Sequence, residues 1–171
     1  MGALWFANPA THTDMGMLYH FARRYGESIA SFRKALDLSP DNQYPHYYLP
    51  FTYVLAGQLD EGFRLWLPWI TRPRSPLAGR EGRLGTEYRS GGWNAVWRAY
   101  LEMKPRDPRM RLRAYLALQR KEEAFVELDG LEKMNDSWTS RLQDPIYDSI
   151  RREPRFQAMR KRLRYPESTW R

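Results

Sequence analysis

Apolar side chains recur early in the chain with the spacing of amphipathic helices. One helix is predicted over about 15–24 and a second over 26–38. The apolar positions on one face of the second helix lie three, six and seven residues from the first of them, at Ile29, Phe32, Ala35 and Leu36. Ser39-Pro40-Asp41-Asn42 ends this helix, because proline cannot continue the hydrogen-bond ladder and Asp and Asn favour turns. The pattern therefore predicts a helical hairpin.

The same arrangement returns 34 residues later. The equivalent pairs are Met15 and Leu49, Gly16 and Pro50, Tyr19 and Tyr53, Phe32 and Trp66, and Ala35 and Trp69. In every pair except that of Gly16 and Pro50, both residues are of a type that usually lies in a protein core. A fixed period of this length predicts repeats that stack side by side. Because Pro50 and Pro68 lie inside predicted helices, we expect a kink at each.

Two less regular repeats follow the first two. Helices are predicted over 84–88 and 93–103, around a glycine turn, and then over 110–118 and 122–134. We expect residues 1–171 to form a single all-α domain, with antiparallel hairpins stacked as a short right-handed superhelical solenoid and a capping segment at the end. The predicted parts are repeats over about 9–42, 43–75, 76–104 and 105–134, and a cap over 135–165.

The first repeat matches a known motif at several positions. With Pro9 as the first residue, the motif's leucine, glycine, tyrosine, alanine, phenylalanine, alanine and proline fall on Met15, Gly16, Tyr19, Ser28, Phe32, Ala35 and Pro40. This pattern resembles the tetratricopeptide repeat (TPR) family. The second repeat departs from the motif, with Pro50 at the glycine position, Gly62 at a small position, and Trp66 and Trp69 where phenylalanine and alanine are usual.

The carboxy-terminal residues carry a different pattern. Its members are Trp138, Leu142, Asp144-Pro145, Tyr147-Asp148, Ile150-Arg151 and Pro154-Arg155-Phe156-Gln157. This string resembles the end of the TPR region in bacterial multidomain signalling and transcriptional regulator proteins, which implies a sensor or adaptor part without its effector domain. From the residues alone, the tail is predicted to cap the last hairpin. The predicted covering side chains are Ile146, Tyr147, Ile150, Phe156 and Met159.

Composition narrows the possible classes of protein. The formal net charge is +8 and is concentrated late in the chain: residues 1–70 carry five basic and six acidic side chains, and 71–171 carry 23 and 14. The chain has no cysteine, which excludes disulfides, thiolate zinc sites and cysteine nucleophiles. No apolar run approaches the roughly 18 residues that span a bilayer, so we expect a soluble, cytoplasmic protein with no membrane contact.

No group of residues has the spacing of a catalytic, cofactor or metal site. The three histidines, His12, His20 and His46, lack metal-ligand spacing. The adjacent carboxylates Asp60-Glu61 and Glu122-Glu123 lie at predicted helix amino ends, where the helix dipole accounts for them. Gly79 to Gly85 lacks the Gly-Lys-Ser/Thr ending of a phosphate loop. We therefore predict a chain that is not an enzyme and has no cofactor.

The TPR resemblance implies protein binding on the concave face of the solenoid. It places the following residues on that face: Met17, His20, Tyr47, Phe51, Arg80, Arg106, Arg109 and Arg113. Aromatic and arginine side chains suit an acidic peptide or protein partner, because arginine binds carboxylates through two parallel hydrogen bonds. The alternative is that Tyr47 and Phe51 are core residues between hairpins.

Two further hypotheses stay open. The basic tail is a candidate for nucleic-acid binding, through Arg151, Arg152, Arg155, Arg160, Lys161, Arg162 and Arg164. Exposed aromatics are candidates for a homodimer contact, and these are Trp5, Trp66 and Trp69.

Overall fold

The structure is a computed structural model that describes residues 8–134 and 141–164. Within these ranges it contains eight α-helices and one 3-10 helix, which confirms the predicted all-α class. The chain divides into two compact units, the first ending at Glu81 and the second beginning at Gly82. Each unit is built from helical hairpins and is described separately below.

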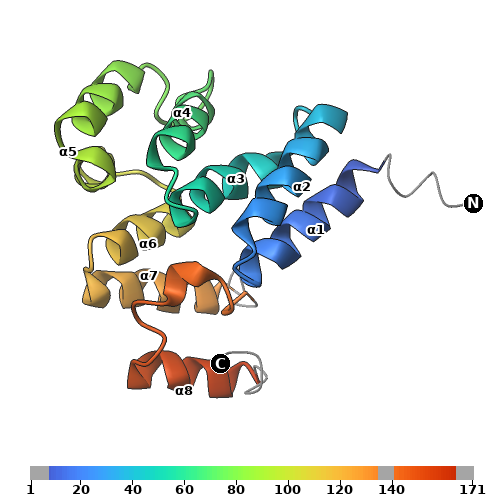
Figure 1. Ribbon diagram of the computed structural model, residues 1–171. Coiled ribbons are helices and arrows are strands. Elements are labelled where there is room, and N and C mark those ends of the chain that lie inside the picture. Colours follow the sequence, from blue (N-terminus) through green and yellow to red (C-terminus); the bar gives the residue numbers. More distant parts are fainter. Residues whose placement is uncertain (1–7, 135–140, 165–171) are drawn as a thin grey trace, which may run out of the picture. The chain divides into compact units, whose positions relative to one another are not determined.

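The first unit consists of two consecutive hairpins. Helix α1 packs against α2, and α3 packs against α4 (Figure 1). The hairpins adjoin because α3 also contacts both α1 and α2. The helices are α1 (Pro9–Phe21), α2 (Tyr25–Leu38), α3 (Gln43–Leu55) and α4 (Leu59–Ile70).

The two hairpins begin with equivalent caps. The Asn8 side chain accepts a hydrogen bond from the Ala10 amide at 2.9 Å, and the Asn42 side chain accepts one from the Tyr44 amide at 3.2 Å. Each satisfies an amide that the first helical turn leaves without a partner in the helix. Asn8 and Asn42 are 34 residues apart, so the sequence period includes the helix starts.

The turns inside the hairpins are equivalent as well. Arg23 and Gly57, again 34 residues apart, both have left-handed backbone conformations, with φ of 61° and 80°. In each turn the next amide returns to the helix, from Arg24 to the Tyr19 carbonyl and from Gln58 to the Tyr53 carbonyl, both at 2.9 Å. This bond ends the helix and reverses the chain.

Within the first hairpin, α1 and α2 meet at a glycine. A Cβ atom on Gly16 would lie 2.5 Å from the Phe32 ring, which is fully buried. Beside this contact the Ser28 hydroxyl donates a hydrogen bond to the Gly16 carbonyl at 2.7 Å. The Phe32 ring stacks on Tyr48 of α3 at a centroid distance of 6.0 Å, so the hairpin contact continues into the next hairpin.

In the second hairpin, the glycine that allows close contact lies on the second helix instead of the first. A Cβ atom on Gly62 of α4 would lie 2.6 Å from the Pro50 carbonyl oxygen of α3. Helices α3 and α4 continue past Pro50 and Pro68, although neither proline has an amide hydrogen to donate. Trp66 is fully buried and fills the space that Phe32 fills in the first hairpin.

The second unit starts with a helix that folds back on itself. Helix α5 (Glu81–Glu102) is interrupted at Gly91 and Gly92, and Gly92 has φ 60° and ψ −153°, a conformation available essentially to glycine alone. Arg83, near the start of α5, forms an ion pair with Glu102 at its end. The two arms are therefore antiparallel, and the turn lies within the predicted segment 89–92.

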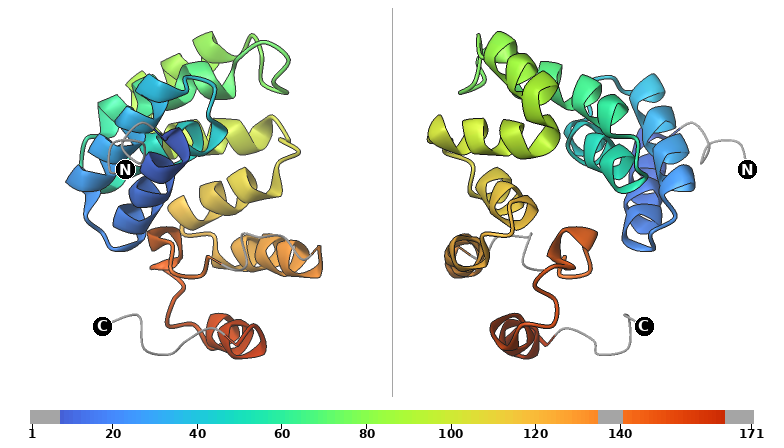
Figure 2. Two further views of the ribbon diagram at one scale, coloured as in Figure 1. Left: turned by 90° about the vertical axis from the view of Figure 1, so that its right-hand side faces the viewer. Right: turned by 60° about the vertical axis from the view of Figure 1, so that its left-hand side comes forward.

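A hairpin and a tail complete the second unit. Helix α6 (Pro108–Ala117) packs side by side with α7 (Lys121–Lys133), as the two views of Figure 2 show. A 3-10 helix, η3 (Pro145–Tyr147), and α8 (Pro154–Arg162) follow. Of the predicted covering residues, Ile146 packs against the α6–α7 core and four are buried in it: Tyr147, Ile150, Phe156 and Met159. Trp138 lies outside the described residues.

Candidate functional site

The predicted partner-binding residues of the first unit gather around Tyr48. Met17 and Tyr47 are half-buried and pack against the core, whereas His20 is fully buried. His20 Nδ1 lies 2.8 Å from the Thr52 hydroxyl, which itself donates to the Tyr48 carbonyl at 2.9 Å. Because that hydroxyl hydrogen is already used, Thr52 accepts a hydrogen bond from Nδ1. His20 therefore joins α1 to α3 from inside the unit.

Tyr47 lies at the edge of an aromatic group. Its ring centroid is 5.3 Å from Tyr48, 5.9 Å from Phe51 and 6.3 Å from Trp69, each in an edge-on arrangement. Phe51 is buried, as expected if it is a core residue, and Tyr47 is partly exposed. Tyr47 is thus held by its neighbours with part of its surface open to solvent.

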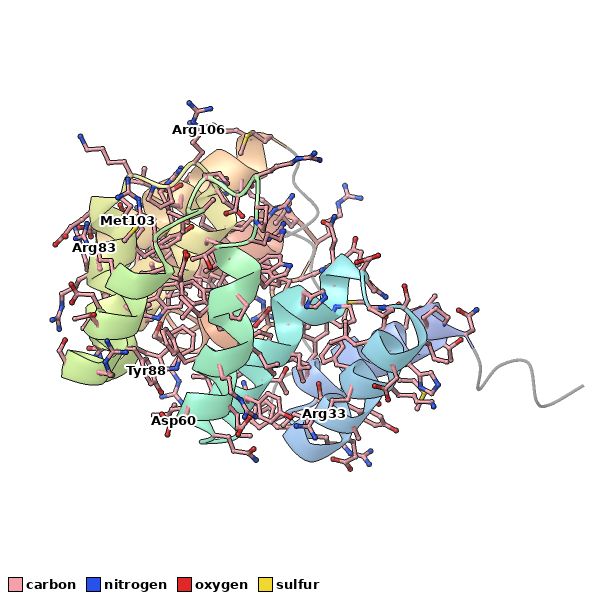
Figure 3. All side chains as sticks on the ribbon, turned by 90° about the horizontal axis from the view of Figure 1, so that it is seen from above. Arg33, Asp60, Arg83, Tyr88, Met103 and Arg106 are labelled. Carbon is pink, nitrogen blue, oxygen red and sulfur yellow. The ribbon has the colours of Figure 1, made fainter. Side chains whose placement is uncertain are left out.

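The predicted arginines differ widely in exposure. Arg80 is exposed at the end of the first unit, and Arg106 is exposed just before α6 in the second unit (Figure 3). Arg109 is partly exposed on α6, but Arg113, one turn further along, is buried at 7% exposure. Direct partner contact was expected for Arg113, His20 and Phe51; their own unit covers these side chains, so they are corrected to internal positions.

Arg111 has a clear structural role that the sequence pattern did not indicate. It donates two hydrogen bonds to Glu127 of α7, from Nε at 2.6 Å and from Nη2 at 2.8 Å. Its Nη1 also donates to the carbonyls of Pro105 and Arg106. Hydrogen bonding to Glu127 raises the pKa of the Arg111 guanidinium above its usual value. Arg111 thereby ties α6 to α7 and to the preceding loop.

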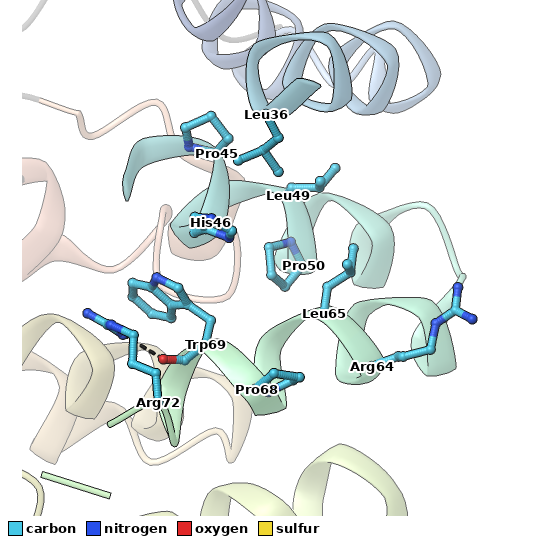
Figure 4. A pocket seen from close by; sticks show the side chains of 10 residues that line it. All are labelled: Leu36, Pro45, His46, Leu49, Pro50, Arg64, Leu65, Pro68, Trp69 and Arg72. Atoms are coloured by element: carbon cyan, nitrogen blue, oxygen red, sulfur yellow. Dashed lines mark hydrogen bonds between the residues drawn. The ribbon is translucent and has the colours of Figure 1, made fainter. Parts of the chain in front are cut away.

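A pocket of about 390 Å³ opens along the seam between α3 and α4 (Figure 4). Its walls are largely apolar, with one contribution from the end of α2. The lining residues are Leu36, Pro45, His46, Leu49, Pro50, Arg64, Leu65, Pro68, Trp69 and Arg72. In the sequence, this pocket is indicated by two bulky residues, Pro50 and Trp69, at positions where the motif has small ones.

Arginines flank the pocket at both ends. Arg72 lies beside Trp69 at one end and Arg64 lies at the other, with Pro50 and Pro68 on the facing helices between them (Figure 4). The Arg72 guanidinium carbon is 4.5 Å from the centroid of the Trp69 ring, and Nη1 donates to the Trp69 carbonyl. This stacking fixes the position of the Arg72 charge. Arg64 pairs with Glu61 one turn earlier.

Basic residues of the tail form ion pairs within the second unit. Four pairs join α7 to the tail, and we call them the α7–α8 ion ladder: Lys121 with Glu153, Arg155 with Glu122, Arg155 with Asp129, and Arg162 with Glu132. The hydrogen bond that Arg162 donates to Glu132 raises the pKa of the Arg162 guanidinium. Arg151 donates to the carbonyls of Leu142 and Asp144 at 3.0 and 3.1 Å. These side chains hold the tail in place.

The tryptophans proposed for self-association are not equivalent. Trp66 is fully buried, so the prediction that it is an exposed dimer contact is wrong. Trp69 is half-buried in the pocket wall, and Trp5 lies outside the described residues.

Within residues 8–134 and 141–164, no three side chains of His, Cys, Asp or Glu come together in a way that would hold a metal ion. No helix in these ranges has the length and apolarity needed to cross a bilayer.

Comparison with known proteins gives one match. Residues 10–42, which include α1 and α2, match the tetratricopeptide repeat family. No curated protein and no solved structure matches the chain. The match supports a role in protein interaction in general, and such repeats are usually non-catalytic. Nothing in the comparisons supports the resemblance of the tail to bacterial multidomain regulators.

Proposed function

We propose that this chain is a non-catalytic protein-interaction module whose first unit binds a protein partner on the face formed by α1 and α3. The observation that carries the proposal is the repeat itself. Residues 10–42 match the tetratricopeptide repeat, and the cap, the turn and the close glycine contact recur in the second hairpin. Stacked hairpins of this kind present extended binding surfaces.

Met17 and Tyr47 are the residues of this face that we expect to contact the partner. They come from helices in contact with each other, and each is partly exposed above the same core. Methionine adapts to irregular apolar surfaces, and tyrosine offers a rigid ring with a polar end. His20 and Phe51 support them from beneath. The exposed charges of Arg80 and Arg106 and the partly exposed charge of Arg109 remain candidates for an acidic partner.

A peptide-display selection on the purified full chain tests this function. Enriched peptides are synthesised with a fluorescent label, and their binding is measured by anisotropy with wild type, Met17→Ala and Tyr47→Ala. We expect each substitution to weaken binding about tenfold, as for a residue central to an interface. Lys34→Ala, at an exposed position of α2, serves as the control.

Two results would count against the proposal. One is a selection that enriches no peptide, and the other is enriched peptides that bind wild type and Tyr47→Ala equally well. Circular dichroism of each variant establishes that a loss of binding does not arise from unfolding.

A further inference from the structure

The seam between α3 and α4 exists because the second hairpin departs from the motif. In the first hairpin the position equivalent to Trp69 is Ala35, which is completely buried. In the second, Trp69 is too large for that space and lies half-exposed, lining a pocket with Pro50 and Pro68. The pocket is lined by residues of α2, α3 and α4 and by Arg72, and Met17 of α1 is not among them.

The two prolines change the hydrogen-bonding capacity of the pocket walls. In an α-helix each carbonyl accepts from the amide four residues later. Pro50 cannot donate to the His46 carbonyl, and Pro68 cannot donate to the Arg64 carbonyl. His46 and Arg64 both line the pocket, so the two carbonyls that lose their α-helical donor belong to lining residues. A ligand with N–H groups suits such walls.

The charges at the two ends suit an anionic ligand of a particular length. Arg64 lies on α4 and Arg72 lies two residues beyond its end; eight residues at the helical rise correspond to about 12 Å between their Cα atoms. An extended peptide covers that distance in about four residues. Because the Arg72 guanidinium is stacked on Trp69, little conformational freedom is lost when a carboxylate binds to it.

We propose that the α3–α4 seam is a second binding site, which takes an acidic peptide segment of a partner protein. An apolar side chain of the peptide enters the pocket, and carboxylates on either side of it pair with Arg64 and Arg72. A peptide is favoured over an aliphatic carboxylate because the peptide supplies N–H donors for the acceptors beside the prolines as well as the apolar and anionic groups. Met17 and Tyr47 do not line the seam, although the Tyr47 ring meets Trp69 of its wall edge-on at a centroid distance of 6.3 Å.

Three synthetic peptide pools test the site on the full chain. The first pool has a fixed leucine with Asp two residues before it and two residues after it, in otherwise random nine-residue peptides. The second replaces both Asp with Asn, and the third replaces the leucine with serine. By fluorescence anisotropy we expect the first pool to bind about tenfold more tightly than either of the others.

Variants assign the binding to the seam. The double variant Arg64→Ala/Arg72→Ala is expected to lower affinity for the Asp pool to that of the Asn pool. The matched control is Arg24→Ala, since Arg24 also lies over an aromatic ring, 4.8 Å from the centroid of Tyr19, and also pairs with a glutamate one turn away. This control is expected to bind like wild type.

Specific outcomes overturn the site. Equal binding of the Asp and Asn pools removes the role of charge, and unchanged binding by the double variant moves the site elsewhere. Binding of decanoate, without binding of the Asp pool, would assign the pocket to aliphatic carboxylates. Loss of binding in Met17→Ala, with binding kept in the double variant, would assign the peptides to the α1–α3 face and leave the seam unsupported.

Discussion

The two hairpins of the first unit share their caps and turns but differ in how their helices meet. In the first, the glycine is on α1 and faces the Phe32 ring, while Ser28 of α2 hydrogen-bonds across the contact. In the second, the glycine is on α4 and faces a backbone carbonyl. The two helices of each hairpin therefore approach each other closely where the glycine lies. The glycine that allows this approach can be on either helix.

The difference also determines where the pocket lies. A glycine on the first helix of a hairpin allows a ring from the second helix to fill the interior, as Phe32 does. A proline at that position adds bulk to the first helix, and Trp69 adds bulk to the second, so the seam of the second hairpin is left open. Departures from the motif therefore mark the position of a surface feature.

The largest effect on stability is expected when a methyl group is added to the contact glycine of either hairpin, Gly16 or Gly62. Gly16→Ala and Gly62→Ala are each expected to destabilise the first unit by about 1–3 kcal/mol, because overpacking outweighs the better helix propensity of alanine. Urea unfolding followed by circular dichroism measures the change. Gly26→Ala, where a Cβ meets nothing within 4 Å, is the control and is expected to unfold at the same urea concentration or a higher one.

Second substitutions distinguish a side-chain clash from a backbone clash. Phe32→Leu removes the ring that Gly16→Ala would contact, so the combined cost should be smaller than the sum of the two. Val54→Ala removes one neighbour of Gly62 but leaves the Pro50 carbonyl 2.6 Å from the new Cβ, so the cost of Gly62→Ala should persist. If both pairs behave alike, the proposed difference between the hairpins is wrong.

A smaller effect is expected at the turns. Arg23 has a left-handed backbone at the position where the second hairpin has Gly57, and this conformation costs a residue with a side chain about 1 kcal/mol. Arg23→Gly should therefore stabilise the first hairpin by about that amount, and Gly57→Ala should destabilise the second by a similar amount. Thermal unfolding of both variants measures this. A loss of stability in Arg23→Gly would mean that its side chain contributes more than the strain costs.

The smallest difference concerns pH. Burial is the main cause that raises the pKa of Tyr53, which is 2% exposed, above the ordinary value of about 10. The stability contributed by the neutral Tyr53 phenol is thus complete below about pH 10. It is lost as the pH rises through the raised pKa of Tyr53. Urea unfolding at pH 8 and at pH 11 should show a smaller alkaline loss in Tyr53→Phe than in wild type. Tyr19→Phe, at the equivalent but partly exposed position, is the comparison, and an identical response in all three proteins would contradict the prediction.

Much of the fold could be predicted because its determinants are local. Apolar spacing, prolines at helix starts and the 34-residue period were enough to indicate the hairpins around Phe32 and Trp66. The glycine turn of α5 was also indicated, since Gly91 and Gly92 interrupt a helical pattern. Helices α3 and α4 run without a break through Pro50 and Pro68, and the kinks expected there stay a prediction.

The candidate site was harder to predict because exposure depends on tertiary contacts. His20, Phe51 and Arg113 have the spacing of a ligand-facing helix side, yet neighbouring helices cover them. Arg111 and Arg113 are two residues apart and look alike in sequence, but one pairs with Glu127 and the other is buried. Pro50 and Trp69 stand at small positions of the motif, but these residues alone do not show that a pocket forms between the helices.

The interruption of α5 has a consequence for the topology of the chain. A 22-residue helix without Gly91 and Gly92 would be a straight rod about 33 Å long. Such a rod would carry its second arm away from the first and offer it to the matching arm of another molecule, which is the geometry of a domain-swapped dimer. Two residues without side chains therefore allow the two arms of this segment to pair within one molecule.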